Sequence, residues 1–401
     1  MDFELPGDDD PRRATVRAWL ADHPAPTGRQ LAEAGYVAPH WPRPWGLEAD
    51  PIHQLVIDEE LRRAGVRRPV NPIGIGWAGP TLIHAGTQAQ KDRYLAPLLS
   101  GEDFWCQLFS EPGAGSDLAN LGTRAVRDGD VYVVNGQKIW TTFAHIARFG
   151  ILIARSDSVA PKHQGISYFV CPMDLPGIEI RPILEMTGAH QFNEVFFDDV
   201  RIPAEHLVGD ENRGWALAKV TLGNERVSLS EGGALWGLGP AAGDLIELVR
   251  KEGGVADASL RQRLAALFIE SEILRLIRLR TVTAAIKGRQ PGPEASVRKV
   301  LADEHGQHIM GLYKDITGAN GMLMDQAEPD RESVLMKGKG RFADPGIWDY
   351  GYLFAPALTI GGGTGDVQRN IIAERVLDLP HDIDVEAGKT WAESRRAATP
   401  A

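Results

Sequence analysis

The residues with the clearest chemical potential lie in a glycine-rich run and in the strand that follows it. The run SEPGAGSD occupies residues 110–117. Glycines let the backbone approach a ligand closely and turn its amides toward an anion. Ser110 and Ser116 add hydroxyl donors, and Trp140 offers a flat apolar face with one polar edge. Together these groups suit a ligand that combines phosphates with a planar polar ring.

A second glycine-rich run, GGGTGDVQRN, occupies residues 361–370. Three consecutive glycines lose much backbone entropy on folding, so the run indicates a specific backbone conformation. By itself, this run predicts only a loop that leads into a helix.

Three weaker patterns carry less chemistry. The run GIGWAG at 74–79 matches G-x-G-x-x-G, but it lies between prolines in a helical region, so close helix packing is favoured over dinucleotide binding. His305 and His308 lack the H-E-x-x-H arrangement, which favours a solvated helix face, and no metal is expected. The nucleophile-elbow and P-loop patterns are absent.

Composition bounds the classes of function. The 401 residues include 43 basic and 54 acidic side chains, a formal charge of -11, which speaks against nucleic acid or an anionic membrane as partner. Cys106 and Cys171 lack metal-type spacing, so a reducing compartment is favoured. With no signal-peptide core and no long apolar run, we expect a soluble cytoplasmic protein without a membrane span.

The elements that must position these groups follow an α–β–α order. Apolar residues at helical spacing predict helices at 12–22, 52–65, 90–99, 215–222, 245–250, 260–287, 295–313 and 371–377. Strand patterns occur at 131–134, 137–142, 150–155, 166–171, 178–183 and 195–197. Asn135-Gly136 predicts a hairpin turn between the first two strands.

These elements predict a multidomain α+β fold. We expect an N-terminal helical domain at 1–103 and a middle antiparallel β-barrel or sandwich domain at 104–207, which would form the flavin and substrate wall. A C-terminal four-helix bundle is expected at 208–385 and a mobile tail at 386–401.

Over residues 104–142, the first run and its strand resemble the flavin-binding signature of the acyl-CoA dehydrogenases. The second run resembles the C-terminal signature of that family, Y-E-G-T followed by an I-Q-R-N-like helix start. The resemblance covers about residues 10–385. It implies FAD bound between the β domain and the C-terminal bundle, and oxidation of the Cα–Cβ bond of an acyl-CoA to the trans-2-enoyl product. It also implies electron transfer to an electron-transferring flavoprotein.

The resemblance assigns roles position by position. Ser110 matches the hydroxyl at the flavin pyrimidine edge, and Ser116 matches the serine near the phosphates of FAD and CoA. Trp140 and Thr142 match the pair that flanks the isoalloxazine ring. The cofactor-binding set that the resemblance implies is Phe109, Ser110, Gly115, Ser116, Trp140, Thr142, Arg250, Gly318, Thr364 and Asp366. The implied substrate-contacting set is Ser116, Arg226, Gly362 and Gly363.

Three departures from the family pattern stand out. The phenylalanine that usually follows the matched arginine is replaced in the run RKEGG at 250–254, and Asp315 replaces the glutamine before the glycine loop. Both changes fall at residues that in the family contact the FAD of a neighbouring subunit. The catalytic glutamate of most members corresponds to Gly362, which cannot accept a proton.

A second family pattern supplies a base elsewhere. Isovaleryl- and long-chain-acyl-CoA dehydrogenases carry the glutamate on a C-terminal-domain helix, directly before an arginine. Glu225-Arg226 stands at that position here, so we predict Glu225 as the catalytic base, against the alternative of a solvated helix glutamate. Gly362 could contribute its backbone N–H to the thioester oxygen.

Three functional hypotheses remain open from the sequence. The chain could be an acyl-CoA dehydrogenase that forms a homotetramer or dimer. It could be one subunit of a hetero-oligomeric dehydrogenase, as among bacterial enzymes that act on steroid side-chain CoA thioesters. It could also be a flavin-free partner that binds CoA esters. Flavin content per purified chain separates the three.

Overall fold

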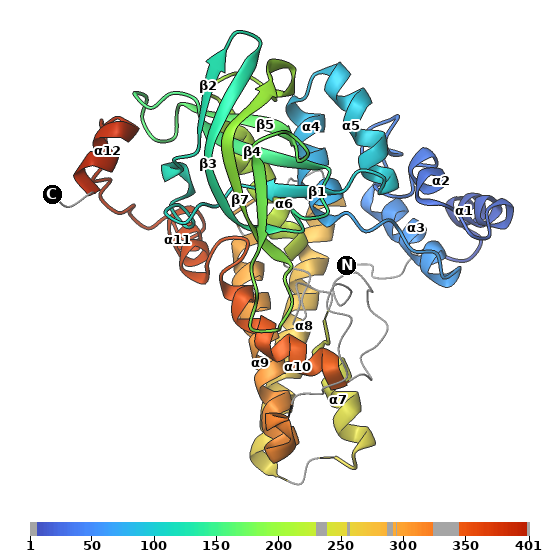
Figure 1. Ribbon diagram of the computed structural model, residues 1–401. Coiled ribbons are helices and arrows are strands. Elements are labelled where there is room, and N and C mark those ends of the chain that lie inside the picture. The colour runs from blue at the N-terminus through green and yellow to red at the C-terminus, as the bar shows by residue number, and fades with distance from the viewer. Residues whose placement is uncertain are drawn as a thin grey trace.

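The computed structural model describes residues 6–229, 239–254, 257–286, 292–293, 295–323 and 345–398. Along the chain, a helical region is followed by a β region and a second helical region (Figure 1). In Figure 1 the sheet lies at the top, with the N-terminal helices beside it and the long C-terminal helices below it.

The N-terminal helices begin at residues that cap them well. Asp10 and Asp50 accept backbone hydrogen bonds at the starts of α1 and α3, while Thr27 and Thr87 form capping boxes at α2 and α5. The helices of this region are α1 Pro11–Asp22, α2 Gly28–Glu33, α3 Pro51–Arg63, η1 Gly74–Ala78, α4 Gly79–Ala85 and α5 Gln88–Ser100.

The G-x-G-x-x-G run lies in the π-helical turn η1 and the start of α4, not between a strand and a helix. A Cβ at Gly79 would lie 2.1 Å from the Trp41 ring, and one at Gly74 would lie 2.4 Å from the Asn71 side chain. These glycines therefore permit close packing, and the dinucleotide interpretation is excluded.

The middle region forms one seven-stranded sheet in the order β1-β4-β2-β3-β7-β6, with β5 beside β4. It is mixed, because β4 pairs in parallel with β1 and β2, where we expected antiparallel pairing throughout. The carboxyl ends of β1 and β4 therefore meet at one edge of the sheet. The strands are β1 Trp105–Leu108, β2 Arg124–Asp128, β3 Val131–Thr142, β4 Phe149–Arg155, β5 Ile166–Pro172, β6 Ile178–Pro182 and β7 Phe192–Pro203.

The predicted hairpin turn at Asn135-Gly136 is wrong. Strand β3 continues through both residues, with an irregularity at Gly136, and pairs with β7 along its length. Asn135 instead bonds across the sheet, donating to the Asp199 carboxylate at 2.9 Å and accepting from the Asp199 amide at 3.0 Å. The turn between β2 and β3 lies at Gly129, whose φ of 64° suits glycine.

Two cores cover the two faces of the sheet. The N-terminal helices and α6 pack on one face around Leu95, Trp105 and Tyr168, and a second cluster around Leu152 and Phe169 covers the other face. Trp105 of β1 belongs to the first cluster. Because side chains alternate along a strand, Gln107, two residues later, faces α6 as well.

The C-terminal helices have their own core around Leu245, Ile309 and Trp348. The elements are α6 Gly214–Leu229, α7 Ala242–Lys251, α8 Ala258–Ile286, α9 Ala295–Thr317, η4 Gly318–Met322, α10 Pro345–Phe354, η5 Ala355–Thr359, α11 Gly365–Arg375 and α12 Trp391–Ala398. No helix within the described ranges is long and apolar enough to cross a membrane.

Residues 386–398 belong to the segment that we expected as a mobile tail. It contains α12, which lies beside the sheet rather than in the bundle (Figure 1). The backbone amides of Trp391 and Ala392 donate to the carbonyls of Ala160 and Ser158, at 2.9 and 3.1 Å. Aromatic and backbone contacts to the β region, invisible in a polar, alanine-rich composition, hold it there.

Candidate active site

The first glycine-rich run leaves the carboxyl end of β1 as a loop held from beneath by one carboxylate. The buried Glu111 accepts hydrogen bonds from the amides of Gly122 at 2.7 Å and Thr123 at 2.9 Å. Lys138 of β3 donates to the same carboxylate at 2.8 Å and to the Phe109 carbonyl at 2.9 Å. Both ends of the loop are thus fixed to the sheet.

The charges of this buried pair compensate each other. Burial alone raises the pKa of Glu111, but the Lys138 ammonium and the hydrogen-bond donors outweigh it and lower that pKa. Burial lowers the pKa of Lys138, with Glu111 opposing the change. Glu111 and Lys138 thus form a buried ion pair beneath the loop.

The outer face of the loop is open. Gly115 and Ser116 are exposed, Ser110 is half-buried, and a Cβ at Gly115 would meet no atom within 4 Å. The Ile139 amide donates to the Ser110 carbonyl at 2.9 Å, which joins the loop to β3. The loop can therefore present backbone amides and hydroxyls to an anionic ligand.

Trp140 lies directly beyond that junction. Its φ is 59°, at an irregularity in the β3–β7 pairing, and its side chain is 57% exposed. One edge of the indole packs against Phe192, with ring centroids 6.0 Å apart. Thr142 follows, half-buried, while Phe109 is buried against Tyr168 on the other side of the loop. An open indole beside open amides fits a cofactor that carries phosphates and a flat ring.

The structure brings Glu225 to the start of this loop. Thr221 of α6 contacts the Tyr168 hydroxyl of β5 at 3.0 Å and the Thr81 hydroxyl at 2.8 Å, which fixes α6 against the sheet. Glu225, one helical turn later, accepts a hydrogen bond from the Gln107 side chain of β1 at 3.2 Å. Glu225 is 6% exposed, so it is not the solvated glutamate of the alternative interpretation. The side chain of Arg226 lies outside the described part of the structure.

The second glycine-rich run forms a turn before α11. Gly362 and Gly363 have φ values of 70° and 90°, which favour glycine. The Gln368 side chain donates to the carbonyls of both glycines, at 3.1 and 3.3 Å. Thr364 caps α11 by accepting from the Val367 amide at 3.2 Å. Asp366, in the first turn of α11, is exposed.

A buried lysine holds this turn from the bundle side. Lys299 of α9 donates to the carbonyls of Leu358 at 3.1 Å and Gly361 at 3.0 Å, and pairs with Asp303 at 2.5 Å. Burial raises the pKa of Asp303 to about 6, although Lys299 opposes the rise. Lys299 therefore holds the turn through hydrogen bonds to backbone carbonyls.

Two predicted cofactor residues lie apart from these motifs. Arg250 is exposed on α7, which Figure 1 places at the end of the bundle away from the sheet, and Gly318 is exposed at the end of α9. The family pattern assigns Arg250 to the cofactor of a neighbouring subunit, so a single chain does not test its role. Asp315 forms an ion pair with Arg263 at 2.6 Å, which neutralises the carboxylate that departs from the family pattern.

The histidines of α9 share one carboxylate. His305 and His308 contact the two oxygens of Glu270 on α8, at 2.8 and 3.1 Å. Within the described ranges, no group of three or more side chains is arranged to hold a metal ion.

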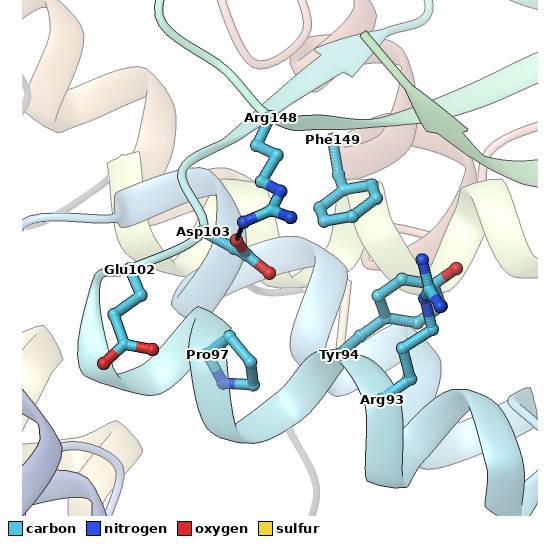
Figure 2. Close-up of a pocket in the computed structure, with 7 residues that line it drawn as sticks. All are labelled: Arg93, Tyr94, Pro97, Glu102, Asp103, Arg148 and Phe149. Atoms are coloured by element: carbon cyan, nitrogen blue, oxygen red, sulfur yellow. Dashed lines mark hydrogen bonds and ion pairs between the residues drawn. The ribbon is translucent and has the colours of Figure 1, made fainter. Parts of the chain in front are cut away.

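A separate pocket of about 300 Å³ lies at the opposite ends of β1 and β4 from the loop (Figure 2). Arg148 reaches across it to Asp103 at 3.0 Å, beside the Phe149 ring. Arg93 stacks on Tyr94 at the far side. None of the predicted site residues lines this pocket.

Comparisons with known proteins identify the family of the chain. Sequence models of the N-terminal, middle and C-terminal domains of acyl-CoA dehydrogenases match residues 10–102, 106–200 and 212–377. The chain belongs to the acyl-CoA dehydrogenase family, whose members are FAD-dependent oxidoreductases. The predicted fold class, enzyme family and cofactor are thereby confirmed.

Relatives and solved structures refine the similarity. The chain is 41% identical over 351 residues to the Mycobacterium tuberculosis acyl-CoA dehydrogenase FadE34, covering 87% of this chain but 45% of that relative. It is 37% identical to acyl-CoA dehydrogenase IpdE1 of the same organism, covering 92% of this chain and 97% of the relative. The structure resembles the Tcur3481–Tcur3483 steroid acyl-CoA dehydrogenase, with a TM-score of 0.74, 30% identity and coverage of 95% and 100%. The ChsE4–ChsE5 complex of M. tuberculosis gives the same four values.

Three supporting residues escaped sequence reasoning. Gln107, Lys138 and Lys299 hold the proposed base, the loop and the turn, but each is a polar residue within an ordinary strand or helix pattern.

Proposed function

We propose that this chain removes the α proton of a bound acyl-CoA through Glu225, as the CoA thioester is oxidised to the trans-2-enoyl product. The α C–H bond breaks, the proton passes to a Glu225 carboxylate oxygen, and its electron pair forms the Cα–Cβ double bond. FAD, when bound, supplies the acceptor for the hydride that leaves the β carbon.

The observation that carries this proposal is the hydrogen bond from Gln107 to Glu225. The donor, Gln107, lies near the carboxyl end of β1, two residues before Phe109 and the open loop. The Glu225 carboxylate that it contacts is buried. Gly362 offers no side chain, so the base of the usual family pattern is missing. The Gly362 N–H remains available in our proposal to polarise the thioester oxygen.

Ser110, Ser116, Trp140 and Thr142 would hold the cofactor on the open face. The loop amides and the Ser116 hydroxyl would bind phosphates, and the Trp140 indole would cover the ring system. The glycine turn with Gly363 and Thr364 would complete the substrate side. These roles rest on the exposure of the loop and Trp140 and on the family pattern that their positions match.

Substitution Glu225→Gln tests the base. The variant should retain yellow flavin, because no cofactor contact is assigned to Glu225, while acyl-CoA-dependent bleaching under anaerobic conditions should slow by about 10²-fold or more. Glu211→Gln is the matched control before α6, where Glu211 pairs loosely with Arg127 at 3.7 Å. Bleaching of Glu225→Gln at the wild-type rate would exclude Glu225 as the base.

A hetero-oligomeric assembly is the second candidate. Two similar structures are named as pairs of chains, Tcur3481–Tcur3483 and ChsE4–ChsE5, and the former is named a steroid enzyme. The long helix α8 exposes large apolar side chains that suit a protein partner, namely Phe268, Ile269, Ile273 and Leu276. We therefore favour an oligomer that includes a related dehydrogenase chain over a homotetramer.

The flavin content and native mass of the purified chain separate these assemblies. A related partner predicts substoichiometric FAD in the isolated chain and about one FAD per site after co-expression. A homotetramer with one FAD per chain would contradict the paired assembly and leave the Glu225 proposal intact.

Electron acceptor and compartment complete the proposal. Family membership supports an electron-transferring flavoprotein as acceptor. Cys106 and Cys171 are both free and buried, which supports work in a reducing compartment such as the cytoplasm.

A further inference from the structure

The C-terminal strap, residues 386–398, runs to the β region, where α12 lies beside the sheet (Figure 1). It contacts the segment that follows the loop at 110–117, which we call the flavin-binding loop after the function proposed for it. Its backbone pairs with the segment between β4 and β5, at Ser158 and Ala160. That segment leaves the same sheet edge as the loop, because β1 and β4 are parallel. The strap therefore reaches the edge on which the cofactor groups stand.

Trp391 is the centre of the contact. Two guanidinium groups lie over its ring, that of Arg155 on β4 at 5.0 Å and that of Arg395 on the strap at 5.3 Å from the ring centroid. The Trp391 indole N–H and the Arg395 guanidinium both donate to the Asn120 carbonyl, at 3.4 Å each. Both cations are attracted by the electron-rich surface of the indole.

Arg155 carries the contact into the loop. It is 2% exposed and donates to the Ala119 carbonyl at 2.6 Å and to the carbonyls of Lys162 and Gln164 at 3.0 Å. Burial lowers the pKa of Arg155 to about 10, so the group stays charged at neutral pH. Trp391 covers this buried charge on its outer side.

Ion pairs of Lys162 form a second connection between the strap and the loop. Lys162 pairs with Glu386 of the strap and with Asp117, the latter at 3.3 Å, and Asp117 directly follows Ser116. At the other end, a Cβ at Gly122 would lie 3.0 Å from Arg395, so the strap packs closely on the residue whose amide binds Glu111. The strap thus contacts the segment 117–122 directly at Asn120 and Gly122, and it is linked to Asp117 through Lys162.

We propose that Trp391 and Arg395 are positioning residues for the flavin-binding loop. By clamping 119–122 from outside, they hold the Glu111-anchored loop in the conformation that presents Ser110 and Ser116 to FAD. Neither residue is assigned a contact with the cofactor. The inference rests on the proposed FAD site and extends it to a segment outside the matched family domains.

The rate at which FAD leaves the purified holoenzyme tests this role. After dilution, free-flavin fluorescence should rise about tenfold faster for Trp391→Ala than for wild type. Trp391→Phe retains an aromatic face and should stay within about threefold of wild type. Lys389→Ala is the matched control, because the one contact described for the Lys389 side chain is to the Val385 carbonyl, four residues earlier in the chain. Helix content by circular dichroism confirms folding in each variant.

The outcomes separate this role from the proposed function. If Trp391→Ala is folded and releases FAD at the wild-type rate, the strap does not position the loop. If Trp391→Ala is insoluble, Arg395→Gln gives the same test with one cation removed, and an unchanged FAD release rate again overturns the inference. A Glu225→Gln variant with normal bleaching would instead remove the proposed base and leave FAD release by Trp391→Ala unaffected.

Discussion

A buried lysine–carboxylate pair holds each of the two glycine-rich motifs, but the pKa of the carboxylate shifts in opposite directions in the two pairs. Beneath each lies a fully buried lysine, Lys138 under the loop at 110–117 and Lys299 under the C-terminal turn. Each lysine pairs with a carboxylate and donates to a backbone carbonyl of its motif. Glu111 in the first pair has a lowered pKa, whereas Asp303 in the second has a raised one.

The difference follows from the number of donors around each carboxylate. Glu111 accepts from two backbone amides as well as from Lys138, so its charge is well solvated by the protein. Asp303 accepts a hydrogen bond from Lys299, which also donates to two backbone carbonyls. The neighbouring Glu304 raises the pKa of Asp303 further. The loop therefore depends on its ion pair, and the turn depends mainly on the contacts of the lysine with carbonyls.

Substitution Glu111→Gln should have the largest effect. The amide retains hydrogen-bonding capacity but leaves the Lys138 ammonium buried without a counter-charge, which costs about 3–5 kcal/mol of unfolding free energy. Chemical denaturation at neutral pH measures this loss. FAD retention should fall as well, because the loop loses its anchor to Gly122 and Thr123.

Glu179→Gln provides the control for this comparison. Glu179 pairs with Arg181 on the exposed edge strand β6, so its loss should leave the unfolding free energy close to that of wild type. Equal effects of the two substitutions would show that the Glu111 pair does not anchor the loop.

The sequence indicated the open surfaces of the proposed site more readily than the groups that support them. Trp140, Ser116 and the glycine turn stand out by their types and spacing, because glycines, hydroxyls and an aromatic ring gather there in short segments. The α–β–α order followed from a change of hydrophobic period, which local sequence does carry.

The supporting groups could not be found in this way. Lys138 and Lys299 bind carbonyls 29 and 62 residues away, and lysine is usually exposed, so nothing local marks either residue as buried. The Asn135-Gly136 pair failed for a related reason, because pairing of β3 with β7 overrode its turn preference. The docking of Trp391 likewise depends on Arg155, far away in the sequence.

Substitution Asp303→Asn should have the smaller effect and the opposite pH dependence. Since the folded-state pKa of Asp303 is raised from 3.8 to about 6, the native state binds this proton more tightly than the unfolded state does. Wild-type unfolding free energy should therefore lose a contribution as pH rises from 3.8 to 6, and this slope should be absent in Asp303→Asn. At pH 7.5, Asp303→Asn should cost less unfolding free energy than Glu111→Gln does, because Lys299 keeps its two carbonyl partners.

Glu111 and Asp303 should contribute to the unfolding free energy with opposite pH dependence. A lowered folded-state pKa means that the contribution of Glu111 is present above 4.5 and is lost as pH falls through the folded value. Denaturation series from pH 4 to 7.5 should thus show a pH-dependent difference between wild type and Asp303→Asn, and a large difference at neutral pH for Glu111→Gln. A loss of 3–5 kcal/mol for Asp303→Asn at pH 7.5 would mean that both motifs rest on ion pairs of equal weight, and would remove the distinction between them.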